Sequence, residues 1–172
     1  FGAVQAQFAH GEIEKRYLAL VHGIVTTDTL TIDAPIGPAP GPVPHRRAVL
    51  PATARGARPA HTEARVRERF AAHTLLEVTP RTGRTHQIRV HLAHLGHPIE
   101  GDVLYGASEA RYAAFVAHLR AGGDPRWPGE RPAGRHLLHA AHLALRHPRS
   151  GARLELAAPP PADFTAAAAR TP

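Results

Sequence analysis

The stretch from Arg81 to His91, RTGRTHQIRVH, concentrates nitrogen donors, because five arginine or histidine side chains surround one glycine. Gly83 permits a tight turn and Thr85 is a good helix N-cap, so the pattern predicts a strand, a glycine turn and the start of a helix. Free N–H groups at a helix start attract an anion, and arginine binds phosphate through a bidentate fork. The stretch therefore predicts a site that receives a negatively charged partner.

Histidines in and after this stretch raise the alternative of a metal site. On a helix, His91 and His94 could share an ion, but Gly96 ends the predicted helix before His97. The chain has no cysteine and no carboxylate cluster nearby in sequence to complete a ligand set, so we expect no metal at His86 or the later histidines. The sequence also lacks a G-x-S-x-G nucleophile elbow, a Walker loop and a G-x-G-x-x-G dinucleotide loop.

Two further residues allow two interpretations each. Arg89 lies about one turn into the predicted helix, on the same side as His86. It could be a surface group whose stem covers apolar atoms, or it could pair with a buried carboxylate, and spacing does not decide. Tyr17 stands at the head of the apolar run YLALVHGIV, where a tyrosine is more often part of the core than catalytic.

Arginine dominates the charge of the chain. Lys plus Arg total 21 against 14 for Asp plus Glu, a formal net charge of +7, and Lys15 is the only lysine. Because arginine contacts phosphate bidentately and stacks on bases, nucleic acid is the leading class of partner. The alternative is that the arginines only keep the surface solvated, and composition does not separate the two.

A basic stripe is predicted in residues 61–70, HTEARVRERF. Apolar residues alternate there with Arg65, Arg67 and Arg69, so a strand would present the three arginines on one face. That face could be solvated or could contact RNA. Residues 74–78, TLLEV, predict a second strand that pairs with the first across a short connection.

Periodicity also predicts the elements that position these residues. The spacing of Phe1, Val4, Phe8 and Ile13 predicts an N-terminal helix, and the apolar run from Tyr17 predicts a buried strand. Residues 36–44 hold four prolines and two glycines and predict a loop.

The second half of the chain continues this alternation. Ile88, Leu92 and Leu95 form the core stripe of the motif helix, and Gly96 suits the left-handed position after its last turn. Residues 108–122 predict another helix, residues 124–135 a loop, and residues 139–159 a hairpin around its turn at 148–151. The tail after Pro159 is expected to fray. Together these elements predict a mixed, largely antiparallel α+β fold with flanking helices.

Several absences bear on the class of protein. No run approaches about 18 apolar residues, so no membrane span is expected, and the first residues do not resemble a signal peptide. A chain without cysteine is compatible with a reducing cytosol. The chain also has no methionine and starts inside the predicted N-terminal helix, so we expect the natural protein to have residues before Phe1.

Residues 81–106, RTGRTHQIRVHLAHLGHPIEGDVLYG, resemble the third sequence motif of the RluA/RluD-type pseudouridine synthases. Other segments agree in order, namely EKRYLALVHG at 14–23, RPAHTEARV from Arg58, and LLHAAHLALRHPRSG with the LELAAPPPADF that follows it. The resemblance covers essentially the whole chain. It implies that residues 1–172 form a pseudouridine synthase catalytic domain whose upstream part is missing.

The resemblance implies an enzyme that isomerises uridines of structured RNA to pseudouridine without a metal or organic cofactor. Such enzymes flip the target uridine out of its stack, and an essential aspartate drives cleavage of the glycosidic bond. By motif position, Tyr17 is the active-site tyrosine and Arg89 is the arginine that pairs with the catalytic aspartate. The residues then expected to contact RNA are Arg65, Arg67, Arg81, Arg84, Thr85, His86 and Gln87.

The chain departs from the family at that aspartate. The family places it in a His-Arg-Leu-Asp motif a few tens of residues before the tyrosine, and no such motif occurs here. Asp102 belongs to the GDVLYG stretch, where a structural role in the turn after Pro98 is expected. We therefore expect the 172-residue chain alone to be inactive.

The remaining expectations concern partners. The predicted substrate is ribosomal RNA, with transfer RNA as the second possibility, and the protein is expected to be a cytoplasmic monomer that does not bind membranes. The competing interpretation is a non-catalytic RNA-binding domain, a degenerate relative that keeps the basic face without the chemistry. Both predict salt-sensitive RNA binding, because arginine contacts to phosphate release counterions.

Overall fold

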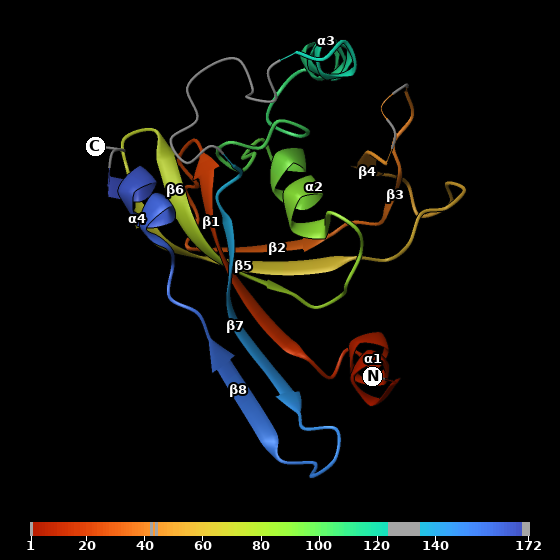
Figure 1. Ribbon diagram of the computed structural model, residues 1–172, viewed down its shortest axis with the longest axis vertical. Coiled ribbons are helices and arrows are strands. Elements are labelled where there is room, and N and C mark those ends of the chain that lie inside the picture. The colour runs from red at the N-terminus through yellow and green to blue at the C-terminus, as the bar shows by residue number, and fades with distance from the viewer. Residues whose placement is uncertain (1, 42, 44, 124–134, 170–172) are drawn as a thin grey trace.

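The computed structural model describes residues 2–41, 43, 45–123 and 135–169 (Figure 1). Its main sheet has the strand order β2-β5-β6-β1-β7-β8, and every neighbouring pair is antiparallel. These strands are β1 (Glu14–His22), β2 (Thr29–Asp33), β5 (His61–Arg69), β6 (His73–Pro80), β7 (Leu138–Arg146) and β8 (Arg153–Ala157).

A small sheet and helices flank the main sheet. The small sheet pairs β3 (Ile36–Pro38) with β4 (Arg47–Val49). Residues 36–44 were predicted as a loop, so the strand β3 at its start was not expected. The helices are α1 (Gly2–His10), α2 (Gln87–His94), α3 (Glu109–Arg120) and α4 (Ala162–Ala169). The expected mixed, largely antiparallel α+β fold with flanking helices is confirmed. No helix in the described ranges has the length and apolar character that a membrane span needs.

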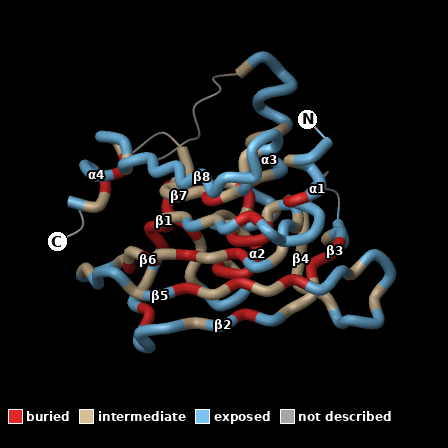
Figure 2. The backbone as a smooth tube through the Cα atoms, turned by 90° about the horizontal axis from the view of Figure 1, so that it is seen from below, coloured by how far each residue is buried: buried red, intermediate tan, exposed pale blue. Residues whose placement is uncertain are grey.

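Strand β1 lies inside the sheet because its sequence is apolar on both faces. Ala19, Leu20 and Val21 are at most 1% exposed, and the strand pairs with β6 on one side and β7 on the other. The figure coloured by burial shows this strand among the buried segments of the molecule (Figure 2). The predicted buried strand is confirmed.

The two faces of the sheet carry different helices. Tyr17 pairs with Val78, which pairs with Ala64, and register partners point to the same face. Thr62, two residues before Ala64, shares that face and binds side chains of α2. The opposite face carries His139, whose ring centroid lies 6.2 Å from that of Phe164 in α4.

The C-terminal tail differs from its prediction. Residues after Pro159 were expected to fray, but α4 forms there. Phe164 is 2% exposed and belongs to the main hydrophobic core, together with Ala167. Burial of one aromatic side chain stabilises a structure by about 1.5–3 kcal/mol, which fixes a helix that composition alone does not reveal.

Helix α1 forms where it was predicted but buries a different residue. Phe8, expected to face the core, is 50% exposed, whereas Gln7 is buried. Gln7 donates from Nε2 to the carbonyl oxygen of Arg146 at 2.8 Å and accepts at Oε1 from the N–H of Arg146 at 2.8 Å. The helix is therefore fixed to β7 by an amide side chain that reproduces a strand-like pair of hydrogen bonds.

Helix α3 and the C-terminal hairpin agree with the sequence. Ser108 caps α3 by accepting from the N–H of Arg111, and Gly122 follows the helix with φ +79°. Leu119, an apolar residue of this helix, is 38% exposed. Strands β7 and β8 form the predicted hairpin (Figure 1), whose turn contains Gly151 at φ +71°. Of the predicted loop at 124–135, all but residue 135 lies outside the described residues.

A β-bulge after Val66 interrupts the basic stripe on β5. The extra residue shifts the alternation of side chains, so Arg69 lies on the opposite face from Arg65. Arg69 instead donates to the carbonyl oxygen of Val25 at 2.8 Å. The prediction that three arginines share one face was wrong, and only Arg65 and Arg67 remain together, on either side of Glu77.

Candidate active site

The RTGRTHQIRVH stretch forms a connecting loop and the start of α2, as predicted, but the strand before it, β6, ends at Pro80 and includes none of its residues. The helix begins at Gln87, however, and the residue in the N-cap position is His86, with no side-chain cap. Thr85, predicted as the N-cap, lies in the turn before it. His86 has φ +59°, a left-handed conformation that is uncommon outside glycine and that the surrounding contacts must hold in place.

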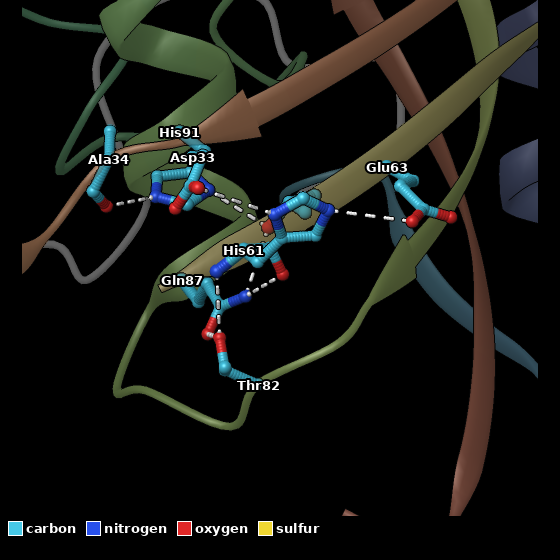
Figure 3. A network of polar contacts seen from close by, with 8 residues as sticks. Asp33, Ala34, His61, Glu63, Thr82, Gln87 and His91 are labelled. Carbon is cyan, nitrogen blue, oxygen red and sulfur yellow. Dashed lines mark hydrogen bonds and ion pairs between the residues drawn. The ribbon is translucent and has the colours of Figure 1, made fainter. Parts of the chain in front are cut away.

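Gln87 joins this loop to the sheet. Its Nε2 donates to the carbonyl oxygen of His61 at 2.9 Å and to the hydroxyl of Thr62 at 3.0 Å (Figure 3). Its Oε1 accepts from the hydroxyl of Thr82 at 2.7 Å and from the N–H of Arg84 at 2.9 Å. Gln87 was expected to contact RNA, but it is 4% exposed and both donors and both lone pairs of its amide are used within the protein. Its role is to hold the loop.

His91 continues this network on the next turn of α2. Its Nε2 lies 2.9 Å from the carbonyl oxygen of Ala34, which can only accept, so Nε2 carries the proton. Its Nδ1 therefore accepts from the hydroxyl of Thr62 at 2.9 Å (Figure 3). Burial lowers the pKa of His91, so the ring is neutral at physiological pH. The network is fully satisfied and fixes α2 on the sheet.

Arg89 forms a buried ion pair with Asp102. Nε lies 2.6 Å from Oδ2 and Nη2 lies 2.7 Å from Oδ1, a bidentate geometry. The side chain of Arg89 is 16% exposed and that of Asp102 is fully buried. Burial opposes the charge of Arg89, but the hydrogen bonds that Arg89 donates to Asp102 and the negative charge of Asp102 together outweigh it, so the pKa of the guanidinium is raised. Of the two interpretations that spacing allowed, pairing with a buried carboxylate is confirmed.

Asp102 also holds the turn that follows it, as expected. Its Oδ1 accepts from the N–H groups of Leu104 at 3.0 Å and Tyr105 at 3.1 Å. One carboxylate thus fixes both the guanidinium of Arg89 and the backbone that places Tyr105. Asp102 was not predicted as the partner of Arg89, although an aspartate in a glycine-flanked turn shortly after the helix is a signal that could have suggested it.

Tyr105 connects Arg89 to His86. The guanidinium carbon of Arg89 lies 5.0 Å from the centroid of the Tyr105 ring, within cation–π range. The hydroxyl of Tyr105 accepts from the N–H of Arg47 at 3.0 Å and is hydrogen-bonded to Nδ1 of His86 at 2.9 Å, in a direction that depends on the tautomer of the ring. Burial, followed by the charge of Arg89, lowers the pKa of His86, so its ring is neutral at physiological pH.

Tyr17 lies on the sheet face that α2 covers. It is half-buried and packs against the main core. Burial raises the pKa of its phenol, so the group is protonated near neutral pH and can donate a hydrogen bond or a proton. The two candidate catalytic residues therefore belong to the same side of the sheet, Tyr17 on a strand and Arg89 on the helix above it.

Of the other candidate RNA-contacting residues, Arg65, Arg67, Arg81 and Thr85 are exposed, and Arg84 and His86 are half-buried. Arg81 pairs with Glu63 at 2.6 Å, and Arg84 donates to the carbonyl oxygen of Pro59 at 2.9 Å. Arg65 and Arg67 share Glu77 at 3.4 and 3.3 Å. Arg81 and Arg84 also line an open groove of about 750 Å³ between α1 and the loop at 81–84.

Lys15 lines the same groove and was missed by the sequence analysis. Its ammonium lies 5.8 Å from the ring centroid of Phe8, and burial lowers its pKa. The sequence carried a signal in that this is the only lysine of an arginine-rich chain, but only the fold brings residue 15 beside residue 84. The groove therefore joins cations from β1 and from the motif loop.

Comparison with known proteins gives consistent matches. A family model described as RNA pseudouridylate synthase matches residues 2–94. The chain is 46% identical over 152 residues to an uncharacterized RNA pseudouridine synthase of Chloroflexus aurantiacus, covering 88% of this chain and 40% of that protein. It is 39% identical over 157 residues to ribosomal large subunit pseudouridine synthase D of Escherichia coli K12, covering 89% and 43%.

A solved structure also resembles the fold. Human RNA pseudouridylate synthase domain containing 1 superposes with a TM-score of 0.68 at 26% identity, covering 92% of this chain and 59% of that one. The chain spans less than half the length of the two curated relatives above. The family-model match includes Tyr17 and Arg89.

Proposed function

The chain belongs to the RNA pseudouridylate synthase family, and from that premise we propose that the protein isomerises uridine to pseudouridine in structured RNA, with ribosomal RNA as its substrate. The observation that carries the proposal is the bidentate ion pair of Arg89, on the helix that covers the same sheet face as Tyr17, within the matched residues. A relative named ribosomal large subunit pseudouridine synthase D supports the choice of ribosomal RNA over transfer RNA.

The reaction exchanges one bond of the base for another. The C1′–N1 glycosidic bond breaks, the uracil turns, C5 bonds to C1′, the C5 hydrogen leaves as a proton, and N1 takes up a proton. No oxidant, reductant or metal is needed for this balance. Tyr17, protonated because burial raises its pKa, would pack against the flipped base and exchange a proton with it.

Arg89 would position the catalytic carboxylate. The bonds to Asp102 use Nε and Nη2, and Nη1 takes no part in them. A carboxylate supplied by the family's His-Arg-Leu-Asp motif could bind at Nη1 while Asp102 holds the guanidinium still. The 172 residues contain no such motif, so we propose that they do not turn over uridine by themselves.

The RNA backbone would lie along the exposed cations. The proposed contacts are Arg81 and Arg84 beside the groove, with Thr85 and His86 in the adjoining turn and Arg65 and Arg67 on β5. Arg81 pairs with Glu63, which is 41% exposed, and Arg65 and Arg67 share Glu77, which is 23% exposed; all three arginines are exposed to solvent, and such pairs are weak enough to exchange for phosphate. A cytoplasmic, monomeric protein is the form we propose for this activity.

Release of tritium from RNA labelled at C5 of uridine tests the proposal, because forming the new C–C bond expels that hydrogen. The full natural gene product should release it from a ribosomal RNA transcript. Arg89→Ala should lower the rate at least about 100-fold, since it misplaces the carboxylate, and Arg120→Ala, an exposed arginine on α3, is the matched control. RNA binding by an active-site-intact protein without any tritium release would instead support the non-catalytic RNA-binding domain.

A further inference from the structure

A compact group of two imidazoles and one carboxylate lies away from the residues discussed so far. Nε2 of His22 is 2.7 Å from Oε2 of Glu100, and Nε2 of His73 is 3.0 Å from the same oxygen. The candidate ligand atoms of the three residues all lie within 4.8 Å of one another. The sequence analysis considered histidines of the motif region and did not identify this group, since its members are far apart in the chain.

Three backbone segments hold these side chains in place. His22 and His73 are direct register partners at the ends of β1 and β6, and their ring centroids are 4.9 Å apart. Glu100 is fixed on the other side of β1, because its N–H donates to the carbonyl oxygen of Leu20 at 2.9 Å and its carbonyl oxygen accepts from Leu137 at 2.8 Å. The group is therefore preorganised by the fold and not by the side chains alone.

We propose that His22, His73 and Glu100 form a binding site for a divalent transition-metal ion of the zinc class. Two imidazoles and one carboxylate are a ligand set that zinc accepts, with bonds of about 2.0–2.2 Å. Ligand atoms of a tetrahedral ion then lie about 3.4 Å apart, so the two nitrogen–oxygen distances of 2.7 and 3.0 Å need to lengthen by only about 0.4–0.7 Å. Imidazole ligands favour zinc, cobalt and nickel over magnesium or calcium.

Two of the three side chains are largely buried and the third is open to solvent, an arrangement that would allow an ion to enter and then be held. His73 and Glu100 are 15% and 11% exposed, whereas His22 is 49% exposed. His73 and Glu100 would shield one side of the ion from water, and the exposed His22 leaves a path for the ion from solvent. A fourth coordination position would face water on the side of His22, as in zinc sites that have three protein ligands.

The surroundings of His73 limit the expected affinity. Coordination through Nε2 moves the ring proton to Nδ1, and Nδ1 of His73 is buried without a hydrogen-bond partner. Loss of such a supporting partner lowers metal affinity by about 10–100-fold in known sites. The site should therefore bind zinc more weakly than a fully supported site of the same three ligands.

An ion bound at this position would also affect Asp102, because Glu100 and Asp102 belong to the same short segment. Glu100 lies two residues before Asp102, and the segment between Pro98 and Glu100 is bonded along β1. Metal binding would fasten that segment to β1 and β6 and so stabilise the turn that carries the partner of Arg89. The proposal stands independently of the proposed RNA chemistry.

Titration of the tag-free, metal-stripped chain with cobalt(II) tests the site. Four-coordinate cobalt absorbs visible light far more strongly than the hydrated ion, so one equivalent should produce a saturable band that zinc abolishes. His22→Ala should weaken binding at least about 10-fold, and His118→Ala, which removes an exposed histidine on α3, should leave binding unchanged. Glu100→Gln, which preserves size, should also weaken it.

Thermal unfolding provides a second readout. Zinc at about 100 times its dissociation constant should lower the unfolding equilibrium constant about 100-fold in the wild-type chain. The same zinc concentration should have no such effect on His22→Ala, whose exposed position makes misfolding an inadequate explanation. Absence of the cobalt band, or equal affinity in wild-type and His22→Ala chains, would overturn the proposal.

Discussion

Two arginine–carboxylate pairs with the same N–O distance differ in how far they are exposed to solvent. Arg89–Asp102 and Arg81–Glu63 both have a closest N–O distance of 2.6 Å. The first pair is 16% and 0% exposed, whereas the second is 55% and 41% exposed. The first region, under α2, is a closed polar network. The second region, which we call the rim of the groove and which comprises Arg81, Arg84 and Glu63, has charged side chains in contact with solvent.

The difference in exposure indicates which residues can position the loop and which are free to bind a ligand. In the closed region every polar group of Gln87 has a protein partner, so a ligand would have to displace several bonds at once. At the rim, Arg81 loses little when it leaves Glu63, because solvent screens both charges. We infer that the stretch from Arg81 to His91 divides into residues that hold the loop and residues that are available for the proposed contacts with RNA.

The largest effect should follow from breaking the buried pair. Asp102→Ala leaves the guanidinium of Arg89 buried without its partner and frees two backbone N–H groups, so the free energy of unfolding should fall by about 3–5 kcal/mol. Glu63→Ala, the matched change at the rim, should alter it by at most about 0.5 kcal/mol. Urea unfolding of both variants measures the contrast. Equal losses would mean that burial does not distinguish the two pairs.

The next effect concerns the amide that closes the network. Gln87→Ala should lower the free energy of unfolding by about 1–3 kcal/mol, because the hydroxyls of Thr62 and Thr82 lose a buried partner. Gln5→Ala, at an exposed position on α1, is the control and should be neutral. Urea unfolding again provides the values. A neutral Gln87→Ala with normal RNA binding would show that the loop does not need this support.

A pH dependence should distinguish His91 from exposed histidines. Its folded pKa lies below the ordinary value of about 6.5, so below that pH the unfolded chain binds a proton that the folded chain does not. The free energy of unfolding should therefore fall as the pH drops from about 6.5 towards the folded pKa, by at most about 1.4 kcal/mol per pH unit. In His91→Gln this part of the slope should disappear, whereas His94→Gln, an exposed neighbour on α2, should keep it.

The smallest effects are expected at the rim. Arg84→Ala should weaken RNA binding only a few-fold at moderate salt and reduce the slope of log affinity against log salt by about 0.7–0.9, the value for one phosphate contact. Arg120→Ala should change neither quantity. Fluorescence anisotropy at several salt concentrations measures both. An unchanged slope for Arg84→Ala would remove this residue from the RNA-binding surface.

The strongest sequence patterns correctly predicted two secondary-structure features and the backbone conformation of one glycine. Continuous apolar character identified β1, turn residues identified the β7–β8 hairpin, and Gly96 adopts the predicted left-handed conformation at φ +84° after α2. These features depend on a few neighbouring residues. Local physical chemistry is enough to specify them.

The features that escaped prediction all depend on distant partners. Burial of Gln7 requires Arg146, the bulge in β5 requires the register with β6, and α4 requires a core that receives Phe164. The pairing of Arg89 with Asp102 and the meeting of His22 with Glu100 depend on the path of the chain after α2. A single sequence shows which residues are able to form such contacts but not which of them the topology brings together.

The central position of β1 also has a consequence for synthesis on the ribosome. Its neighbours are β6 and β7, and the second of these is translated about 120 residues after β1 begins, a wait on the order of 6–25 s at ordinary elongation rates. During that time the apolar YLALV segment has emerged while one of its edges has no strand to pair with. The nascent chain should therefore depend on chaperones, and slow translation between β6 and β7 should prolong that dependence.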